Sequence, residues 1–284
     1  MSIQFIRILR RAAKLTQTHP APPPIAPPST MPHTPLALFH TPGLLEAGID
    51  EAGRGPLFGR VYAAAVILPP DDSFPHELMK DSKRFTSRAK LQEMSEIIKA
   101  MAVEWAIAFA EASEIDKNNI LRTTHNTMHR ALDQLTLLPD QLLVDGDRFR
   151  PYWKDHEVVP HVCVCKGDNT YTSIAAAGIL AKVARDDWID LVCDADPTLD
   201  ERYGFRSNKG YGTGQHMDAL RVHGPTAGHR MTFAPCSLAT TPLPPPETPE
   251  TPETPADLDR DEGNEEENQG LAAADELRTL ATRI

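Results

Sequence analysis

The sequence has no long hydrophobic run and no cysteine pattern typical of a metal-binding protein. No apolar stretch approaches the roughly 18 residues that a membrane-spanning helix needs, so we expect no membrane anchor. The four cysteines show no zinc-ligand spacing, and they indicate a reduced, cytoplasmic setting. Cys163 and Cys165 alternate in an apolar run, and we expect both side chains to face the protein core.

The sequence also lacks the net positive charge that is usual for a protein that binds nucleic acid. Its formal net charge is −11, but the charge is uneven along the chain. Residues 1–40 contain four basic and no acidic residues, whereas residues 237–284 contain three basic and twelve acidic residues. A local basic stripe, or metal ions that bridge carboxylates to phosphates, would still permit contact with nucleic acid.

Composition divides the 284 residues into three parts. Residues 1–43 are basic and then proline-rich, which predicts a disordered extension, although the first 14 residues would also suit a transit peptide or a membrane-surface helix. Residues 44–236 have the length and pattern of one catalytic domain. Residues 237–284 are rich in Pro, Thr and Glu, so we expect a disordered acidic tail that buries no core.

Strand and helix patterns alternate through the predicted catalytic domain. The predicted strands are Leu44–Asp50, Arg60–Leu68, Val103–Phe109, Gln141–Val144 and Val158–Cys165. In the third of these, we expect the apolar residues Trp105, Ile107 and Phe109 on the buried face. The predicted helices run from Ser87, as N-cap, to Met101, from Asn118 to Leu135, from Thr172 to Ala195, and from a basic loop at Tyr203–Gly214 to His223. This order predicts an α/β fold, with a mixed β-sheet flanked by helices and a small C-terminal helical extension.

Four acidic residues end an apolar run or follow one closely: Asp50, Glu51, Asp145 and Asp168. Neighbouring side chains of a regular strand point to opposite faces, so Asp50 and Glu51 can converge only where the strand ends and turns. Strands that end side by side would gather all four carboxylates, which repel one another unless cations neutralise them. Carboxylate oxygens suit hard divalent cations, and we therefore expect a site for two such ions. A solvated turn at Asp50-Glu51 and a helix cap at Asp168 are the simpler alternatives.

Several segments together resemble the ribonuclease HII family, the type 2 ribonucleases H of bacteria. The resemblance extends from about Leu44 to Pro235. The segments that carry it are Gly48-Ile-Asp50-Glu51-Ala-Gly53-Arg54-Gly55-Pro56-Leu57, Asp81-Ser82-Lys83, Val144-Asp145-Gly146, Lys166-Gly167-Asp168, the helix Ser173–Asp186, and Lys209-Gly210-Tyr211. The resemblance implies a ribonuclease H-like fold.

It also implies an endoribonuclease that hydrolyses the RNA strand of RNA/DNA hybrids and nicks 5′ of single ribonucleotides embedded in duplex DNA. Two ions, Mn²⁺ or Mg²⁺, would be held by the four carboxylates, and cleavage would leave a 3′-hydroxyl and a 5′-phosphate. The implied partners are RNA/DNA hybrids and DNA duplexes that contain ribonucleotides. The implied roles are ribonucleotide excision, DNA repair and DNA replication, and we expect a monomeric catalytic domain in the cytoplasm.

The resemblance assigns substrate contacts as well. The segment Gly53-Arg54-Gly55 would contact the ribose 2′-hydroxyl, the group that distinguishes RNA from DNA. Tyr211 would stack against the sugar on the 3′ side of the ribonucleotide. Phosphate contacts are expected from the basic residues Lys83, Arg84 and Lys166. A structural hairpin turn at the glycine segment and a buried core tyrosine at Tyr211 are the alternatives.

The sequence departs from the family pattern at a few positions. Arg84-Phe85-Thr86 stands where Lys-Leu-Ser is usual, Gly178 where serine is usual, and Gly212 where proline often follows the tyrosine. None of these changes removes an expected metal ligand. Two other functions stay open, a DNA-cutting nuclease of the same superfamily and a hybrid-binding or scaffold protein. The elements that would contact the 2′-hydroxyl argue against the first, and the intact carboxylate set argues against the second.

Overall fold

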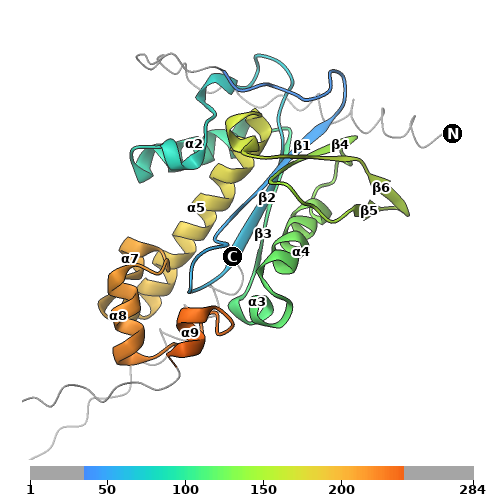
Figure 1. Cartoon of the computed structure of the whole chain (residues 1–284). Helices are drawn as coiled ribbons and strands as arrows, with labels where there is room; N and C mark the ends of the chain where they lie inside the picture. The colour runs from blue at the N-terminus through green and yellow to red at the C-terminus, as the bar shows by residue number, and fades with distance from the viewer. Residues whose placement is uncertain (1–34, 240–284) are drawn as a thin grey trace, which may run out of the picture. The chain divides into compact units, whose positions relative to one another are not determined.

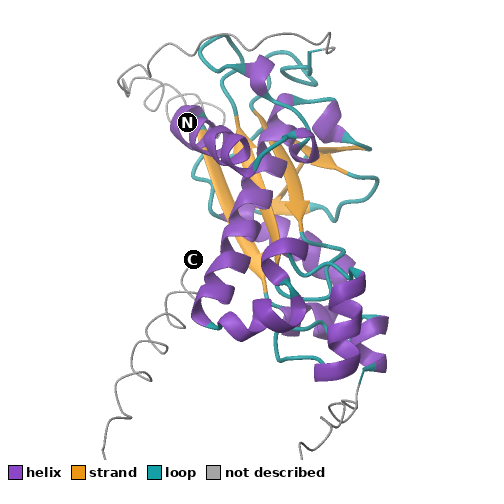
Figure 2. Ribbon diagram, turned by 90° about the vertical axis from the view of Figure 1, so that its left-hand side faces the viewer, coloured by secondary structure: helices purple, strands orange, loops and turns teal. Residues whose placement is uncertain are grey.

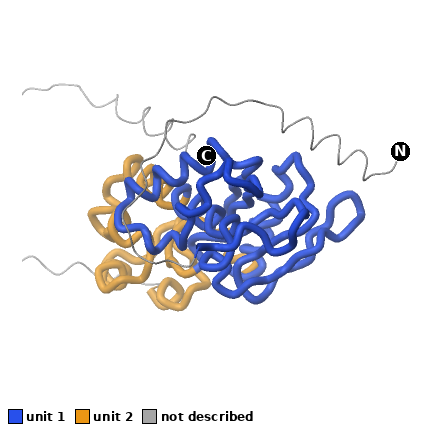
Figure 3. The backbone as a smooth tube through the Cα atoms, turned by 90° about the horizontal axis from the view of Figure 1, so that it is seen from above, with its two compact units in different colours: residues 1–54, 61–110, 120–184 blue, residues 55–60, 111–119, 185–284 orange. Residues whose placement is uncertain are grey.

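The structure is a computed structural model of the chain, and it describes residues 35–239 (Figure 1). The chain divides into two compact units. Figure 3 colours unit 1, which includes residues 61–110 and 120–184, and unit 2, which includes residues 55–60, 111–119 and the chain from residue 185 onward. The expectations for residues 1–34 and 240–284 lie outside the described residues.

Unit 1 is built on a five-stranded sheet with the strand order β3-β2-β1-β4-β7. Strand β2 pairs antiparallel with β1 and β3, whereas β4 pairs parallel with β1 and β7. The strands are β1 (Glu46–Ala52), β2 (Val61–Ile67), β3 (Glu104–Ala110), β4 (Gln141–Asp145) and β7 (His161–Val164). Because β1, β4 and β7 run parallel, their carboxyl ends meet at one edge of the sheet. The predicted α/β fold with a mixed sheet is confirmed.

Helices cover both faces of this sheet (Figure 1, Figure 2). Ala47 and Ile49 of β1 are fully buried in a cluster that includes side chains of α4. Gly48 points to the other face, where an added Cβ would lie 2.2 Å from the carbonyl carbon of Ser173 in α5. Only glycine at this position lets α5 approach the sheet so closely. The helices of unit 1 are η1 (His76–Leu78), η2 (Ser82–Arg84), α2 (Arg88–Met101), α4 (Ile120–Asp133), η3 (Gly167–Asn169) and the first half of α5 (Thr172–Ala195).

The strand predicted over Val158–Cys165 is wrong, because Pro160 interrupts it. Proline has no N–H to donate to a sheet, and the chain forms β6 (Glu157–Val159) before this residue and β7 after it. Strand β6 pairs with β5 (Tyr152–Lys154) in a separate hairpin that the sequence analysis did not predict. Cys165 lies beyond the end of β7 and is exposed, so the prediction that it faces the core is also wrong.

The buried face of β3 is the opposite of the one predicted. Ala106, Ala108 and Ala110 are buried, whereas Trp105 is 36% exposed. Ala106 and Ala108 belong to the same buried cluster as the side chains of α4. Small side chains allow a helix to pack closely on a strand, so the alanines, and not the larger apolar residues, form the core-facing row.

The helix predicted from Asn118 to Leu135 occurs as α4 (Ile120–Asp133), and a separate short helix that was not predicted precedes it. Helix α3 (Ala112–Asn118) ends at Asn119, whose φ of +64° is outside the helical range, and α4 begins at the next residue. Helix α3 belongs to unit 2 and α4 to unit 1. The helix with Ser87 as N-cap, the long helix α5 and the short helix that ends at His223 match their predicted positions.

Unit 2 is helical. A stack of aromatic rings lies in its core, in which Phe58 and Tyr203 flank Phe205 at centroid distances of 4.1 and 5.1 Å. Besides α3 and the end of α5, its helices are α6 (Pro197–Tyr203), α7 (Phe205–Asn208), α8 (Gly214–His223) and α9 (Ala234–Leu238). Helix α7 lies in the segment that was predicted as a loop. Within residues 35–239, no helix has the length and apolar character needed to cross a membrane.

Candidate active site

Asp50 and Asp145 are neighbours at the edge of the sheet where the parallel strands end. Ile49 of β1 pairs with Val144 of β4, and each aspartate follows its paired residue directly. Neighbouring strands are about 4.8 Å apart, so the two aspartate backbones lie side by side. The structure therefore brings these two predicted ligands together, as the strand pattern indicated.

Asp168 joins this edge through the turn that follows β7. Asp145 pairs with Val164, the last residue of β7, and η3 begins three residues later with Gly167 and Asp168. The backbone N–H of Gly167 donates a hydrogen bond of 2.7 Å to Oδ1 of Asp145. This bond ties the turn that carries Asp168 to the end of β4.

Strand β1 does not end at Asp50, so this boundary was predicted incorrectly. The antiparallel ladder with β2 continues through Glu51 and Ala52, because both residues still pair with β2. No turn therefore lies between Asp50 and Glu51, but their carboxylates still interact, since the charge of Glu51 raises the pKa of Asp50 and the charge of Asp145 raises the pKa of Glu51. The turn begins only at Gly53, which has a φ of +94°.

The carboxylate of Asp50 lies against α5. Its Oδ1 accepts a hydrogen bond of 2.7 Å from the backbone N–H of Glu51. On the helix, a Cβ added to Gly178 would lie only 2.3 Å from Oδ2 of Asp50. Gly178 therefore provides the space that this carboxylate occupies, a role that the sequence analysis did not identify.

The acidic side chains at this edge act on one another through their charges. Burial raises the pKa of Asp50 well above its usual value, and the charges of Glu51, Asp145 and Asp168 raise it further. Burial also raises the pKa of Glu51, although the Arg54 guanidinium, 3.3 Å away, opposes this shift. Burial and neighbouring carboxylates raise the pKa of Asp168 as well. Raised carboxyl pKa values are the expected result when several anions are buried close together.

Lys83 lies within the field of the same carboxylates. The side-chain amide of Asn169 donates to Oδ1 of Asp168 at 3.0 Å and to Oδ2 of Asp81 at 3.4 Å, so the segment that contains Lys83 lies beside η3. Burial lowers the pKa of Lys83, but Asp81, Asp168, Asp50 and Asp145 more than offset this effect and raise it. Of the three predicted phosphate contacts, Lys83 is therefore the one that the structure associates with the carboxylates.

Of the other predicted substrate residues, Gly53 is buried, whereas Arg54, Gly55, Arg84, Lys166 and Tyr211 are exposed. Arg84 ends η2, and Lys166 precedes η3 with a φ of +57°. In unit 2, a Cβ added to Gly55 would lie 3.5 Å from ring carbon Cε1 of Tyr211. The side chain of Tyr211 is 45% exposed, so it is not the buried core tyrosine considered as an alternative.

The carboxylates suit a divalent cation by their charge and by the type of donor atom, but their oxygen atoms are not clustered closely enough to surround one ion. Within residues 35–239, no group of three or more His, Cys, Asp or Glu residues is close enough to hold a metal ion. Burial and, after it, repulsion between the carboxylates raise the pKa values of Asp50 and Asp168, and a bound cation would relieve this repulsion. Four carboxylate groups are also the oxygen donors that Mg²⁺ and Mn²⁺ prefer.

Comparison with known proteins assigns the chain to a family. Residues 47–236 match the family model described as Ribonuclease HII. The chain belongs to the ribonuclease HII family. Ribonuclease HII of Bacteroides thetaiotaomicron is 48% identical over 190 residues, which cover 67% of this chain and 90% of the relative. Ribonuclease HII of Phocaeicola vulgatus is 49% identical over 190 residues, which cover 67% of this chain and 89% of that one.

A solved structure shares the fold. The ribonuclease H2 from Pyrococcus horikoshii OT3 matches with a TM-score of 0.56 at 22% identity, covering 68% of this chain and 96% of that one. Membership of the ribonuclease HII family confirms the predicted activity, since the protein is an endonuclease of the ribonuclease H type. The family depends on divalent metal ions and acts on RNA/DNA hybrids. The roles predicted for individual residues stay predictions.

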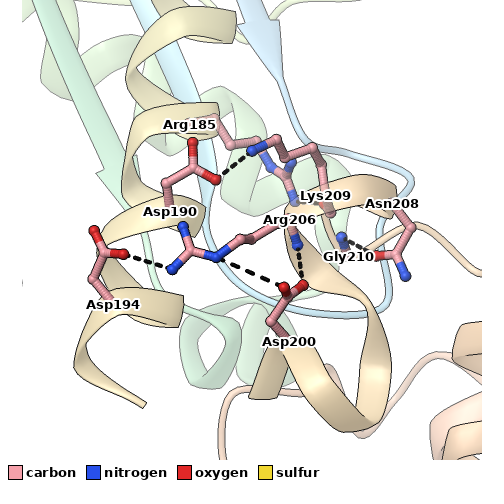
Figure 4. Close-up of polar contacts among 8 residues, drawn as sticks. All are labelled: Arg185, Asp190, Asp194, Asp200, Arg206, Asn208, Lys209 and Gly210. Carbon is pink, nitrogen blue, oxygen red and sulfur yellow. Dashed lines mark hydrogen bonds and ion pairs between the residues drawn. The ribbon is translucent and has the colours of Figure 1, made fainter. Parts of the chain in front are cut away.

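Arg185 is a further residue that the sequence analysis did not identify. This side chain of α5 is 1% exposed and donates to the backbone carbonyls of Phe58, Arg60 and Lys209. Its guanidinium carbon also lies 5.8 Å from the ring centroid of Tyr211. Figure 4 shows Arg185 beside Lys209, whose ammonium group pairs with Asp190 at 2.6 Å. No local signal in the sequence reveals it, because Arg185 stands in a charged stretch of α5 beside Asp186 and Asp187.

Proposed function

We propose that this ribonuclease HII family member nicks duplex DNA on the 5′ side of single embedded ribonucleotides and hydrolyses the RNA strand of RNA/DNA hybrids. The reaction would use two metal ions and leave a 3′-hydroxyl and a 5′-phosphate. The observation that carries this proposal is the placement of Asp50, Asp145 and Asp168 at one edge of the sheet, where parallel strands end together.

In this proposal Asp50, Glu51, Asp145 and Asp168 hold two Mg²⁺ or Mn²⁺ ions. Bound ions would activate a water molecule and stabilise charge on the departing 3′-oxygen. The chain's own residues set the positions of the carboxylates, through the Gly167 N–H on Asp145 and the space at Gly178 for Asp50. Lys83 would contact a phosphate of the bound strand, which its position near the carboxylates supports.

We assign recognition of the ribonucleotide to two further elements. The segment Gly53-Arg54-Gly55 would contact the 2′-hydroxyl, and the exposed ring of Tyr211 would stack against the sugar on the 3′ side. The close approach of Gly55 to the ring of Tyr211 supports a shared role. Arg84 and Lys166, both exposed, would contact phosphates of the backbone.

The biological setting follows from the activity. Removal of single ribonucleotides and of RNA paired with DNA belongs to ribonucleotide excision, DNA repair and DNA replication. The named relatives are bacterial proteins, which supports a cytoplasmic location, and in this proposal the catalytic domain acts as a monomer directly on nucleic acid.

One assay tests the proposal. A DNA duplex with one internal ribonucleotide and a matched all-DNA duplex are incubated with Mg²⁺, Mn²⁺ or a chelator. We expect metal-dependent nicking of the first duplex only, and a loss of about 100-fold or more in Asp145→Asn. Asp147→Asn is the matched control, since Asp147 is two residues away with a side chain that is 74% exposed. Equal cutting of both duplexes would indicate a DNA nuclease, and binding without cutting would indicate a scaffold.

A further inference from the structure

Two buried histidines of unit 2 form a hydrogen-bonded pair that the proposed chemistry does not use. His216 in α8 and His229 are 0% and 1% exposed, and their Nε2 atoms lie 3.0 Å apart. Nδ1 of His216 lies 3.0 Å from the backbone carbonyl oxygen of Tyr211. Nδ1 of His229 lies 2.8 Å from the backbone nitrogen of Thr226.

These contacts determine where each proton lies. A backbone N–H can only donate, so the N–H of Thr226 requires an unprotonated Nδ1 on His229. The proton of neutral His229 is then on Nε2 and donates to Nε2 of His216. His216 consequently carries its own proton on Nδ1, where it donates to the carbonyl of Tyr211, a group that can only accept. The pair thus forms a directional chain of hydrogen bonds that ends on Tyr211.

All hydrogen bonds of this chain can form only if the rings of His216 and His229 are both neutral. A second proton on His229 would place an N–H against the N–H of Thr226, and a second proton on His216 would place two N–H groups face to face. Burial lowers the pKa of both histidines, to about 4 for His229, in agreement with neutral rings. The rings of Tyr203 and Phe205 pack against both histidines and hold them in place.

The contact between His216 and the carbonyl of Tyr211 is important because the side chain of Tyr211 is not itself buried. Its ring is 45% exposed, so its position depends on the backbone that carries it. That backbone is fixed at both ends of the residue, since the N–H of Tyr211 donates to Asn208 at 2.9 Å and its carbonyl accepts from Thr213 at 2.8 Å. The buried side chain of His216 adds a second hydrogen bond to this carbonyl.

We propose that His216 and His229 are positioning residues for Tyr211, which fix its backbone so that the exposed ring is presented to the sugar beside the ribonucleotide. This inference rests on the stacking role proposed for Tyr211. A structural role alone would predict that loss of the pair lowers stability without changing how the enzyme distinguishes its substrates. The positioning role predicts a specific loss at the single-ribonucleotide junction.

The first test compares two substitutions of His216. The amide nitrogen of asparagine reaches the place of Nδ1 and keeps a donor for Tyr211, whereas that of glutamine reaches the place of Nε2 and does not. We expect His216→Gln to slow single-turnover nicking at a single ribonucleotide by about tenfold or more, and His216→Asn to recover part of that rate. Cleavage of a continuous RNA/DNA hybrid, measured in parallel, should fall much less. His223→Gln, an exposed position of the same helix, is the control and should keep the wild-type rate.

A double-substitution cycle with Tyr211→Ala separates the possible failures. If His216 acts through Tyr211, the combined variant nicks no more slowly than Tyr211→Ala alone. Additive losses, or a wild-type rate in His216→Gln while Tyr211→Ala is slow, overturn the positioning role and leave the proposed function intact. A wild-type junction rate in Tyr211→Ala overturns the stacking role, and the positioning role with it.

A measurement on the unmodified protein requires no variant to fold. Nitrogen-15 NMR of the imidazole rings at pH 7 should show His216 as the neutral Nδ1–H tautomer and His229 as the neutral Nε2–H tautomer. The opposite tautomer on either ring, or a charged ring at this pH, would show that the hydrogen-bond chain does not end on Tyr211 and would overturn the proposal.

Discussion

At the scale of single residues, Gly178 is the position where one added methyl group would most directly disturb the carboxylates. A Cβ there would lie 2.3 Å from Oδ2 of Asp50, a distance at which one of the two groups must move. Alanine would also remove the cost of a glycine inside a helix, about 1 kcal/mol. The clash with Asp50 is unfavourable, whereas the removal of a helical glycine is favourable. The two effects partly cancel in the stability of the fold, but only the clash affects the nicking rate.

We predict that Gly178→Ala lowers the nicking rate by about 10- to 100-fold, because it displaces the carboxylate of Asp50, while the free energy of unfolding changes by less than about 1 kcal/mol. Single-turnover nicking and urea unfolding measure the two quantities. Gly214→Ala, with nothing within 4 Å of its added Cβ, serves as the control. A wild-type rate in Gly178→Ala would show that Asp50 is free to move.

At the scale of elements, Arg185 joins the end of α5 to the loop of residues 55–60 within unit 2. Its guanidinium donates to carbonyls of Phe58 and Arg60 in that loop, and to Lys209 before Tyr211. The planar, forked guanidinium can donate in several fixed directions at once, which a lysine ammonium cannot match.

We therefore predict that Arg185→Lys lowers the free energy of unfolding by about 2–4 kcal/mol, because buried carbonyls lose charged donors. Urea unfolding of the full chain provides the measurement. Arg221→Lys is a matched control, since the side chain of Arg221 is 65% exposed and pairs with Asp218 on the surface of α8. A loss no larger in Arg185→Lys than in this control would contradict the role assigned to Arg185.

The elements that the sequence predicted well are those with strong local signals. Helix α2 has Ser87 at its N-cap and α5 an alanine-rich start, and both helices occur as predicted. The errors arise where tertiary packing decides. The alanine face of β3 is buried because α4 packs on it, and α3 was missed because it has only seven residues. The hairpin before β7 was missed because its strands are only three residues long.

The candidate site shows the same division. The end of β4 at Asp145 was evident from its apolar run, whereas β1 continues two residues beyond Asp50, and the parallel pairing of β1 and β4 places the two aspartates at a common edge. The space at Gly178 could not be predicted, because it depends on the distance between a helix and the sheet. The contact of His216 with the backbone of Tyr211 was equally out of reach, because it is a tertiary contact between a buried ring and a carbonyl group.

At the scale of the whole molecule, the buried histidine pair links stability to pH. Burial and the neighbouring His216 lower the pKa of His229 from 6.5 to about 4. Above pH 6.5 both the folded and the unfolded chain leave this ring neutral. Between the two pKa values the unfolded chain binds a proton that the folded chain excludes, so stability falls as the pH falls through this window.

We predict that the wild-type protein loses about 3 kcal/mol more unfolding free energy than His229→Gln between pH 7.5 and pH 4, since each unit of pKa shift corresponds to about 1.4 kcal/mol. Urea unfolding of both proteins at several pH values measures the difference, and the contributions of the carboxylates common to both proteins cancel. Parallel pH profiles for the two proteins would contradict the prediction.

The glycine at position 48 has a consequence for how the enzyme can be altered. Gly48 fixes how near α5 lies to the sheet, and the same helix carries Gly178 against Asp50. The distance between α5 and the sheet therefore determines how much space the carboxylate of Asp50 has. A side chain introduced at Gly48 would move α5 away from the sheet and from Asp50, without replacing any residue proposed to take part in the chemistry. The cleavage rate could therefore be altered by a substitution in the protein core.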